Sequence, residues 1–204
     1  MRLYYFPGAC SLADHIALKW SGLPHEAIRM DKESIKSEAY LKLNPAGAVP
    51  LLVHDEFVLA ENVAILDYVA SNAPDAALLG DGVQGRAQTL RWLAYLNSDV
   101  HGAFKPLFSP RRFLDDESQI EAIAESARAQ VARHLEVLDR QLENRHWITG
   151  ARSVADPYLF VMLRWATRHN ISLDSFRNLL RFLERMYADA GAFAAIAEEE
   201  DQLE

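Results

Sequence analysis

The apolar pattern of this chain changes character a little over a third of the way along its 204 residues. In the first part, short apolar or aromatic stretches suited to strands alternate with segments in which apolar residues recur at helical spacing. Strands are expected at 2–6, at 25–30 and twice within 48–62, and helices from Ser11 to Gly22, over 34–43 and over about 62–71. The predicted order of elements is therefore βαβαββα.

No further strand signal follows, and helical periodicity fills most of the remaining chain. The helical segments cover 86–106, 117–145, 153–168 and 174–188. Between the two parts, residues 73–86 are rich in Pro, Gly, Asp and Ala, a composition typical of linkers. We expect an α/β domain over residues 1–75, a linker over 76–85 and an all-helical bundle domain over 86–204.

Charge and cysteine content exclude several classes of function. The net charge is −8 and the longest charge cluster is the acidic EEEDQLE (198–204), so nucleic acid is not an expected partner. One cysteine cannot form an internal disulfide, and no cleavable leader or long apolar run is evident, so we expect a cytoplasmic protein without membrane contact. The seven histidines are scattered, with no Cys/His pair at ligand spacing, and no metal is expected.

The only cysteine, Cys10, lies where the first strand meets the first helix, after a turn at Pro7-Gly8. At a helix N-terminus it would face unpaired N–H groups and the positive end of the helix dipole. Both favour a thiolate, so we predict a lowered pKa and a nucleophilic Cys10 rather than a small buried apolar residue. The order of elements and the position of Cys10 resemble the thioredoxin fold. Ala13, however, stands where a Cys-x-x-Cys pair has its second thiol, so a mixed disulfide at Cys10 would need a thiol from solution to resolve it.

The chain as a whole resembles the cytosolic glutathione transferases, in which a thioredoxin-like domain precedes a helical one. YYFPGACSLADHIAL (4–18) looks like the opening of the bacterial beta class, which has cysteine where other classes have tyrosine or serine. The other similar segments are NPAGAVPLL (44–52) before a cis-proline, ENVAILDYVA (61–70), where Asn62 replaces the usual Ser, and SVADPYLF (153–160). In the last segment Ser153 and Asp156 form a capping box, which is a folding device rather than a catalytic pair.

This resemblance implies glutathione as co-substrate, with no other cofactor. Glu61 would pair with the α-ammonium group, while the Asn62 amide and nearby backbone N–H groups would receive the α-carboxylate at a helix N-terminus. A cis bond between Val49 and Pro50 would turn the Val49 N–H and C=O toward the cysteinyl part of glutathione.

Further contacts are implied at the other end of glutathione and in a dimer. The glycyl carboxylate would meet Lys36 or Lys32. Ser98 and Asp99 would reach the glutathione of a partner subunit. We expect a homodimer, because the family pairs through the helices at 62–71 and from about 86, which carry apolar residues beyond what one inward face requires: Val63, Leu66, Leu90 and Leu93.

The residues implied in catalysis are Cys10, His101 and Ser11. His101 lies at the distance from Cys10 at which the beta class has a histidine, and its imidazole would stabilise a thiolate or relay its proton. Ser11 is a rival activator, and Tyr5 a more distant one. A small hydrophobic electrophile would lie between the first domain and apolar groups of the second: Met162, Trp165 and Phe108.

The first hypothesis for function is conjugation of the glutathione thiolate to small hydrophobic electrophiles. An alternative enzyme is a glutathione-dependent disulfide reductase that acts through a mixed disulfide at Cys10. A further alternative is a non-catalytic binding module with the same architecture, against which the intact Cys10 and the Glu61-Asn62 pair argue.

Overall fold

The computed structural model describes residues 1–201, so the last three residues of the acidic cluster 198–204 lie outside it. The first part contains β1 (Arg2–Tyr5), α1 (Ser11–Ser21), β2 (Glu26–Arg29), η1 (Ser34–Lys36), α2 (Glu38–Leu43), β3 (Leu51–His54), β4 (Phe57–Ala60), α3 (Asn62–Ser71) and η2 (Pro74–Ala76). The second contains α4 (Gly82–Tyr95), η3 (Leu96–Val100), α5 (His101–Phe108), η4 (Pro110–Arg112), η5 (Glu117–Gln119), α6 (Ile120–Gln141), α7 (Ala155–Arg168), α8 (Arg177–Ala188) and α9 (Ala190–Asp201). The predicted βαβαββα order and the helical second part are confirmed.

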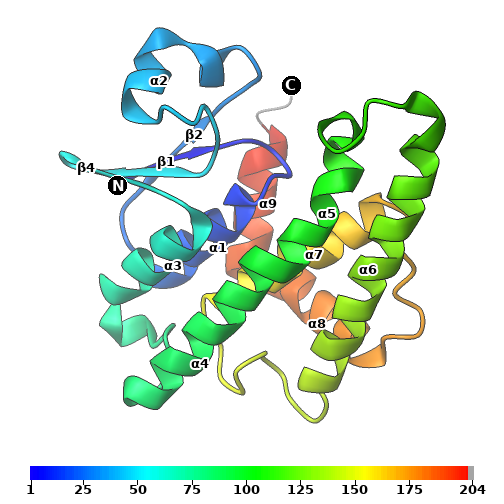
Figure 1. Cartoon of the computed structure of the whole chain (residues 1–204). Coiled ribbons are helices and arrows are strands. Elements are labelled where there is room, and N and C mark those ends of the chain that lie inside the picture. The colour runs from blue at the N-terminus through cyan, green and yellow to red at the C-terminus, as the bar shows by residue number, and fades with distance from the viewer. Residues whose placement is uncertain (202–204) are drawn as a thin grey trace.

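One mixed sheet organises the N-terminal part, with strand order β2-β1-β3-β4. β1 pairs parallel with β2 and antiparallel with β3, and β4 is an edge strand. Leu3 and Leu52, which are paired in register, belong to the main core with α1 and α3, while Leu51 and Val53 pack with Tyr40 of α2 on the other face. Figure 1 shows α2 on one side of the sheet and α1 and α3 on the other.

The helical part differs from the predicted segments at both ends. α4 begins at Gly82, inside the stretch predicted as linker, and a π-helical turn, η3, separates it from α5 within the segment predicted as one helix. α9 was not predicted, because its sequence AGAFAAIAEEED has an indistinct apolar face and a strongly charged end. Single π-helical turns are rare and often lie at functional sites, which directs attention to residues 96–101.

A continuous core joins the two parts, and it corrects one prediction from the sequence. Leu66 and Leu93 are both fully buried within this core, so neither is a spare apolar residue available to a partner subunit. Val63 and Leu90 are partly buried against the same core. The argument for a dimer from these four residues was therefore wrong for two of them.

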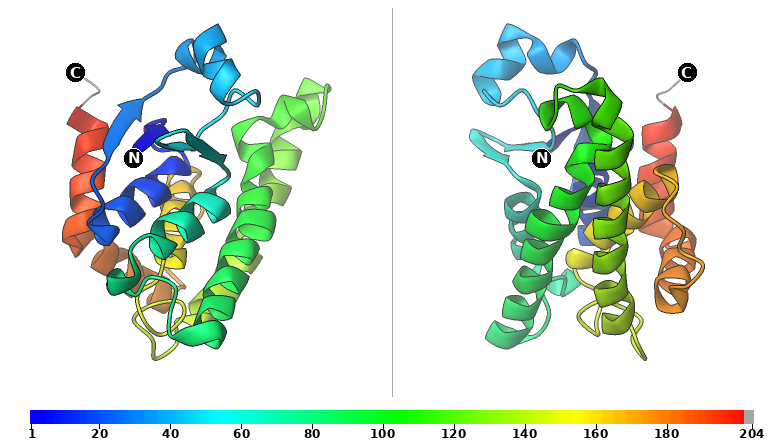
Figure 2. Two further views of the ribbon diagram at one scale, coloured as in Figure 1. Left: turned by 90° about the vertical axis from the view of Figure 1, so that its left-hand side faces the viewer. Right: turned by 45° about the vertical axis from the view of Figure 1, so that its right-hand side comes forward.

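α9, at the C-terminal end of the described chain, packs against α1, which lies near the N-terminus (Figure 2). His15 of α1 is fully buried, with Nε2 3.1 Å from a Glu198 oxygen and Nδ1 3.4 Å from a Glu199 oxygen. Trp20 donates its indole N–H to Asp189 at 2.7 Å. The acidic end of α9 is thus a structural contact and not only a solvated face.

Within residues 1–201, none of the helices is long and apolar enough to cross a membrane.

Candidate functional site

The loop before Cys10 is held from both sides by the helical part. The Gly8 N–H donates to Glu199 of α9 at 3.2 Å, and the Gly8 carbonyl accepts the indole N–H of Trp165 from α7 at 2.9 Å. Gly8 has φ of 72°, a left-handed conformation that glycine adopts without steric cost. These contacts fix Cys10 at the first turn of α1, as predicted.

The surroundings of the Cys10 thiol do not favour a thiolate. Its Sγ lies 3.8 Å from the Val49 carbonyl oxygen, to which the neutral thiol donates. Burial, with smaller contributions from Asp14 and Glu61, raises the pKa of Cys10 to about 12, and the N–H groups of Cys10 and Ser11 offset this only in part. The prediction of a lowered pKa was wrong, because the helix N-terminus is visible in the sequence and the desolvation of the thiol is not.

Ser11 and Tyr5 are structural residues in the first domain. Ser11 is fully buried, and its hydroxyl accepts the Phe6 N–H at 3.2 Å and lies 3.4 Å from the Phe6 carbonyl oxygen. It closes the turn between β1 and α1, which leaves it poorly placed to activate a bound thiol. Tyr5 is fully buried in β1, with its ring 5.7 Å from that of His15.

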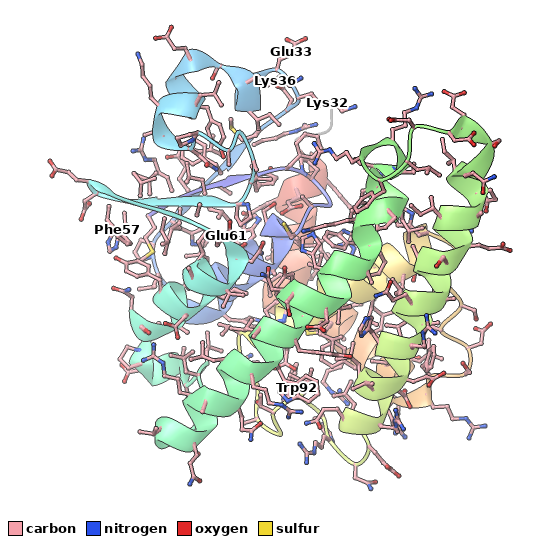
Figure 3. All side chains as sticks on the ribbon, viewed as in Figure 1. Lys32, Glu33, Lys36, Phe57, Glu61 and Trp92 are labelled. Atoms are coloured by element: carbon pink, nitrogen blue, oxygen red, sulfur yellow. The ribbon has the colours of Figure 1, made fainter. Side chains whose placement is uncertain are left out.

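A cavity of about 190 Å³, here called the polar pocket, lies between the first domain and the start of α5. The Val49-Pro50 bond that borders it is cis. Glu61, labelled in Figure 3, lies at the N-terminus of α3, and its side chain makes no capping hydrogen bond there. Its backbone has φ of 76° and ψ of 120°, an unfavourable conformation for a residue with a side chain. The residues that line the pocket are Cys10, Asn44, Ala46, Ala48, Val49, Pro50, Ala60, Glu61, Asn62, Asn97 and His101.

The side-chain amide of Asn62 was predicted to receive a carboxylate of glutathione, but in the structure it donates hydrogen bonds within the protein. Its Nδ2 donates to the Cys10 carbonyl at 2.9 Å and to Asp14 Oδ2 at 2.8 Å, so both amide hydrogens are used inside the protein. Asp14 is fully buried, burial raises its pKa well above the ordinary value, and its Oδ1 has no hydrogen-bond partner within residues 1–201. The Asn62 amide therefore orients the start of α1, and only backbone N–H groups of α3 remain to receive a carboxylate.

Four other predicted binding residues lie outside the polar pocket. Lys32 and Lys36 are exposed side chains on the segment between β2 and α2, labelled in Figure 3. Ser98 and Asp99 are exposed on η3, where Ser98 donates to the Ala94 carbonyl at 2.8 Å and also to Asp99. A contact of these four residues with glutathione stays a prediction.

His101 is oriented by a chain of hydrogen bonds that the sequence did not suggest. The fully buried Tyr158 of α7 donates its hydroxyl to Asn97 Oδ1 at 2.9 Å, and its oxygen lies 2.9 Å from His101 Nδ1. Because the phenol has one proton, His101 must carry its proton on Nδ1, which leaves Nε2 as an acceptor. Burial, with a smaller effect of Lys105, lowers the pKa of His101 to about 4, so the imidazole is neutral at neutral pH.

A second cavity, here called the aromatic pocket, lies on the other side of Cys10 and has a volume of about 450 Å³. The Trp165 ring centroid is 4.8 Å from that of His101 and 4.7 Å from that of Phe108. Met162 is fully buried in the core and does not line this pocket, contrary to prediction, whereas Trp165 and Phe108 do. The lining residues are Phe6, Pro7, Gly8, Ala9, Cys10, His101, Leu107, Phe108, Trp165, Arg168 and His169.

Asp156 acts in folding, as predicted, and more extensively than a capping box alone. It is fully buried, and its carboxyl accepts hydrogen bonds from the N–H and hydroxyl of Ser153 and from the N–H of Ile148. Burial raises the pKa of Asp156 to about 7. Among the described residues there is no group of three or more His, Cys, Asp or Glu side chains able to hold a metal ion.

The protein combines a thioredoxin-like sheet domain with a helical domain, and two cavities meet at its cysteine. This arrangement is typical of the glutathione transferases, and similarity to known proteins supports the same class. Residues 3–77 match the family description "Glutathione S-transferase, N-terminal domain", and residues 92–190 match "Glutathione S-transferase, C-terminal domain". The chain belongs to the glutathione S-transferase family.

Three bacterial proteins show how similar the chain is to individual members of the family. A glutathione S-transferase of Xanthomonas campestris is 46% identical over 201 residues, covering 98% of each chain. The structure of a bacterial beta class enzyme of Sphingomonas chungbukensis matches with a TM-score of 0.87 and 38% identity over 98% of each chain. A sphingomonad glutathione S-transferase complexed with glutathione matches with a TM-score of 0.87 and 36% identity, over 98% of this chain and 99% of that one.

Proposed function

We propose that this protein conjugates the sulfur of glutathione to small hydrophobic electrophiles, with glutathione in the polar pocket and the electrophile in the aromatic pocket. The observation that carries the proposal is that Cys10 and His101 line both cavities. Sulfur and electrophile would therefore meet at these two side chains. Glu61 would bind the α-ammonium group, and the α3 N-terminus the α-carboxylate.

The state of the Cys10 thiol favours conjugation over disulfide reduction. Attack on a disulfide requires the Cys10 thiolate, which is scarce at neutral pH with a pKa of about 12. A neutral thiol can instead donate a hydrogen bond to the glutathione thiolate and stabilise it. The polar pocket also argues against a non-catalytic module.

His101 is the proposed acceptor for the glutathione thiol proton. With its proton on Nδ1, held by Tyr158, and a pKa of about 4, the Nε2 lone pair is available at neutral pH. Tyr158 is in this proposal a positioning residue, which fixes the tautomer and the ring orientation without touching substrate.

The proposed roles of the two domains and the proposed dimer are those expected for the glutathione S-transferase family. Residues 1–75 would form the glutathione-binding domain, and the helical domain after the 76–85 segment would complete the electrophile site and the interface of a homodimer. Glutathione is the co-substrate, no other cofactor is proposed, and the expected location is the cytoplasm. Light scattering at micromolar concentration tests the dimer, which a monomer mass would contradict.

Two experiments test the function. Saturating glutathione should stabilise the protein against heat, by about 2.7 kcal/mol at a hundredfold excess over its dissociation constant. Cys10→Ala should keep conjugation within roughly tenfold of the parent rate, about 1.4 kcal/mol, and lose entirely whatever low glutathione-dependent disulfide reduction the parent shows. The absence of a thermal shift, or of any conjugation by the parent protein, would refute the proposal.

A further inference from the structure

Arg168 lines the aromatic pocket and forms no ion pair with the described side chains. Arg168, at the C-terminal end of α7, lines the pocket beside Trp165 and His169. Its guanidinium lies over the Gly8 backbone, with Nη1 3.5 Å from where a Cβ at Gly8 would be. Among the side chains of residues 1–200, no Asp or Glu oxygen lies within 4.0 Å of its nitrogens, although the chain carries a net charge of −8.

The carboxylates closest to this region already have other partners. Glu199 uses its two oxygens on the Gly8 N–H and on His15. Glu200 lies 3.9 Å from Arg164, one turn before Arg168 on α7. Arg164 in turn has a buried nitrogen, Nη1, without a hydrogen-bond partner among the described residues. Arg168 and Arg164 also line a cavity with Glu199 and Glu200, so these carboxylates lie near Arg168 without forming an ion pair with it.

The pKa values of the two histidines in the pocket are affected by nearby cations. The pKa of His169 is lowered by burial and then by Arg168 and Arg128. The pKa of His101, at the other end of the pocket, is lowered by burial and then by Lys105. No carboxylate is a cause of either shift, so the charges that act on the pocket's two histidines are positive.

We infer that the aromatic pocket selects flat aromatic electrophiles with an anionic substituent, such as a carboxylate, which Arg168 binds while the ring packs among Phe108, Trp165 and His101. Guanidinium pairs with a carboxylate through two parallel hydrogen bonds, and the partly apolar surroundings strengthen that pairing. The cavity volume of about 450 Å³ suits one substituted ring. The inference rests on the proposed conjugation and adds the charge of the substrate.

A matched pair of substrates separates charge from reactivity: 4-chloro-3,5-dinitrobenzoate and its methyl ester. In both, the glutathione thiol gives its proton to His101, which passes it to solvent, and the sulfur forms a C–S bond at the ring carbon while chloride leaves with the electrons of the C–Cl bond. After division by the uncatalysed rates, we expect kcat/KM to favour the benzoate by roughly fivefold to tenfold at low salt. The preference should shrink as KCl is raised from 0.05 M to 0.5 M.

Variants assign that preference to Arg168. In Arg168→Met the ratio of benzoate to ester should fall close to one, mainly through a higher KM for the benzoate, and Arg168→Lys should keep part of it as a point charge. The control is Arg145→Met, which removes an exposed arginine that lines neither pocket and should keep the parent ratio.

Binding without turnover gives a second measurement. The unreactive 3,5-dinitrobenzoate should quench tryptophan fluorescence with a lower Kd than its methyl ester, and Arg168→Met should remove that difference. Conjugation of the ester with no preference for the benzoate, or a preference that survives in Arg168→Met, would overturn the inference and leave the proposed function intact. Failure to conjugate either substrate would overturn both.

Discussion

The two pockets on either side of Cys10 are built from different parts of the chain. The polar pocket is bordered mainly by the first domain, with the cis Val49-Pro50 segment, Glu61 at positive φ and the N-terminus of α3. The aromatic pocket is lined by residues 6–10 of the first domain and by residues of α5, α7 and the position after α7. The helical part contributes more of the aromatic pocket than of the polar pocket, so substitutions on α5 and α7 can change the specificity of the aromatic pocket and leave most of the polar pocket unchanged.

The N-termini of two helices show the same contrast on a smaller scale. At α7 the buried Asp156 carboxyl satisfies nearby N–H groups inside the core. At α3, Glu61 makes no capping hydrogen bond, and the helix start borders the polar pocket. The carboxyl at the start of α7 is used inside the core, whereas the carboxyl before α3 is proposed to bind a ligand.

The largest expected effect concerns the α7 N-terminus. The pKa of Asp156 is raised to about 7 in the folded protein, so its contribution to stability is present below the unfolded pKa, near 4, and is lost as pH rises through 7. Between pH 5 and pH 8 the parent should lose about 2–3 kcal/mol of unfolding free energy from this group. Asp156→Asn should lack that component when urea unfolding is measured at both pH values; equal pH dependence in the two proteins would contradict the assignment.

The next effect concerns ligand recognition in the polar pocket. Glu61→Gln removes the negative charge proposed to pair with the ammonium group of glutathione, and KM for glutathione should rise roughly thirtyfold, about 2 kcal/mol, with a smaller change in kcat. Glu56→Gln, on the exposed turn between β3 and β4, is the control and should leave KM unchanged. An unchanged KM in Glu61→Gln would remove Glu61 from the site.

A smaller effect is expected for the positioning of His101. Tyr158→Phe removes the acceptor of the Nδ1 proton, and kcat should fall about tenfold with little change in KM for glutathione. Tyr95→Phe is a matched control, since it removes a similar contact of 2.8 Å, to His134 Nδ1, away from both pockets. Equal losses in the two variants would indicate a general effect on packing.

The smallest effect tests the backbone at Glu61. Because φ of 76° is unfavourable for a residue with a side chain, Glu61→Gly should raise the unfolding free energy by about 0.5–1 kcal/mol and abolish the thermal shift with glutathione. Glu56 is not among the positive-φ residues, and Glu56→Gly should lower stability slightly. A loss of stability in Glu61→Gly would show that the conformation carries no cost.

The sequence predicted the elements well where the signal was local. The β1–α1 junction at Pro7-Gly8, the end of α1 at Gly22 and the span of α3 all depend on turn residues and short-range periodicity. Periodicity does not show which of two apolar faces is turned inward. For that reason Leu66 and Leu93 were expected on the outside and lie in the core.

The site was less predictable, because its chemistry depends on contacts between distant residues. Tyr158 contacts His101 across 57 positions, and its only signal in the sequence is one hydroxyl on an otherwise apolar helix face. The pKa of Cys10 depends on desolvation and on Asp14, which the position at a helix N-terminus does not reveal. Arg168 resembles any helix-end arginine until the pocket beside it is known.

The contact of Glu199 with the Gly8 N–H has a consequence for how the protein is made. A ribosome releases the loop that carries Cys10 before nearly all of the other described elements, and α9 after them. The Gly8 N–H and the buried His15 imidazole thus wait for their partners through most of synthesis. The loop before Cys10 therefore reaches its final contacts only after α9, the last described element, has been synthesised.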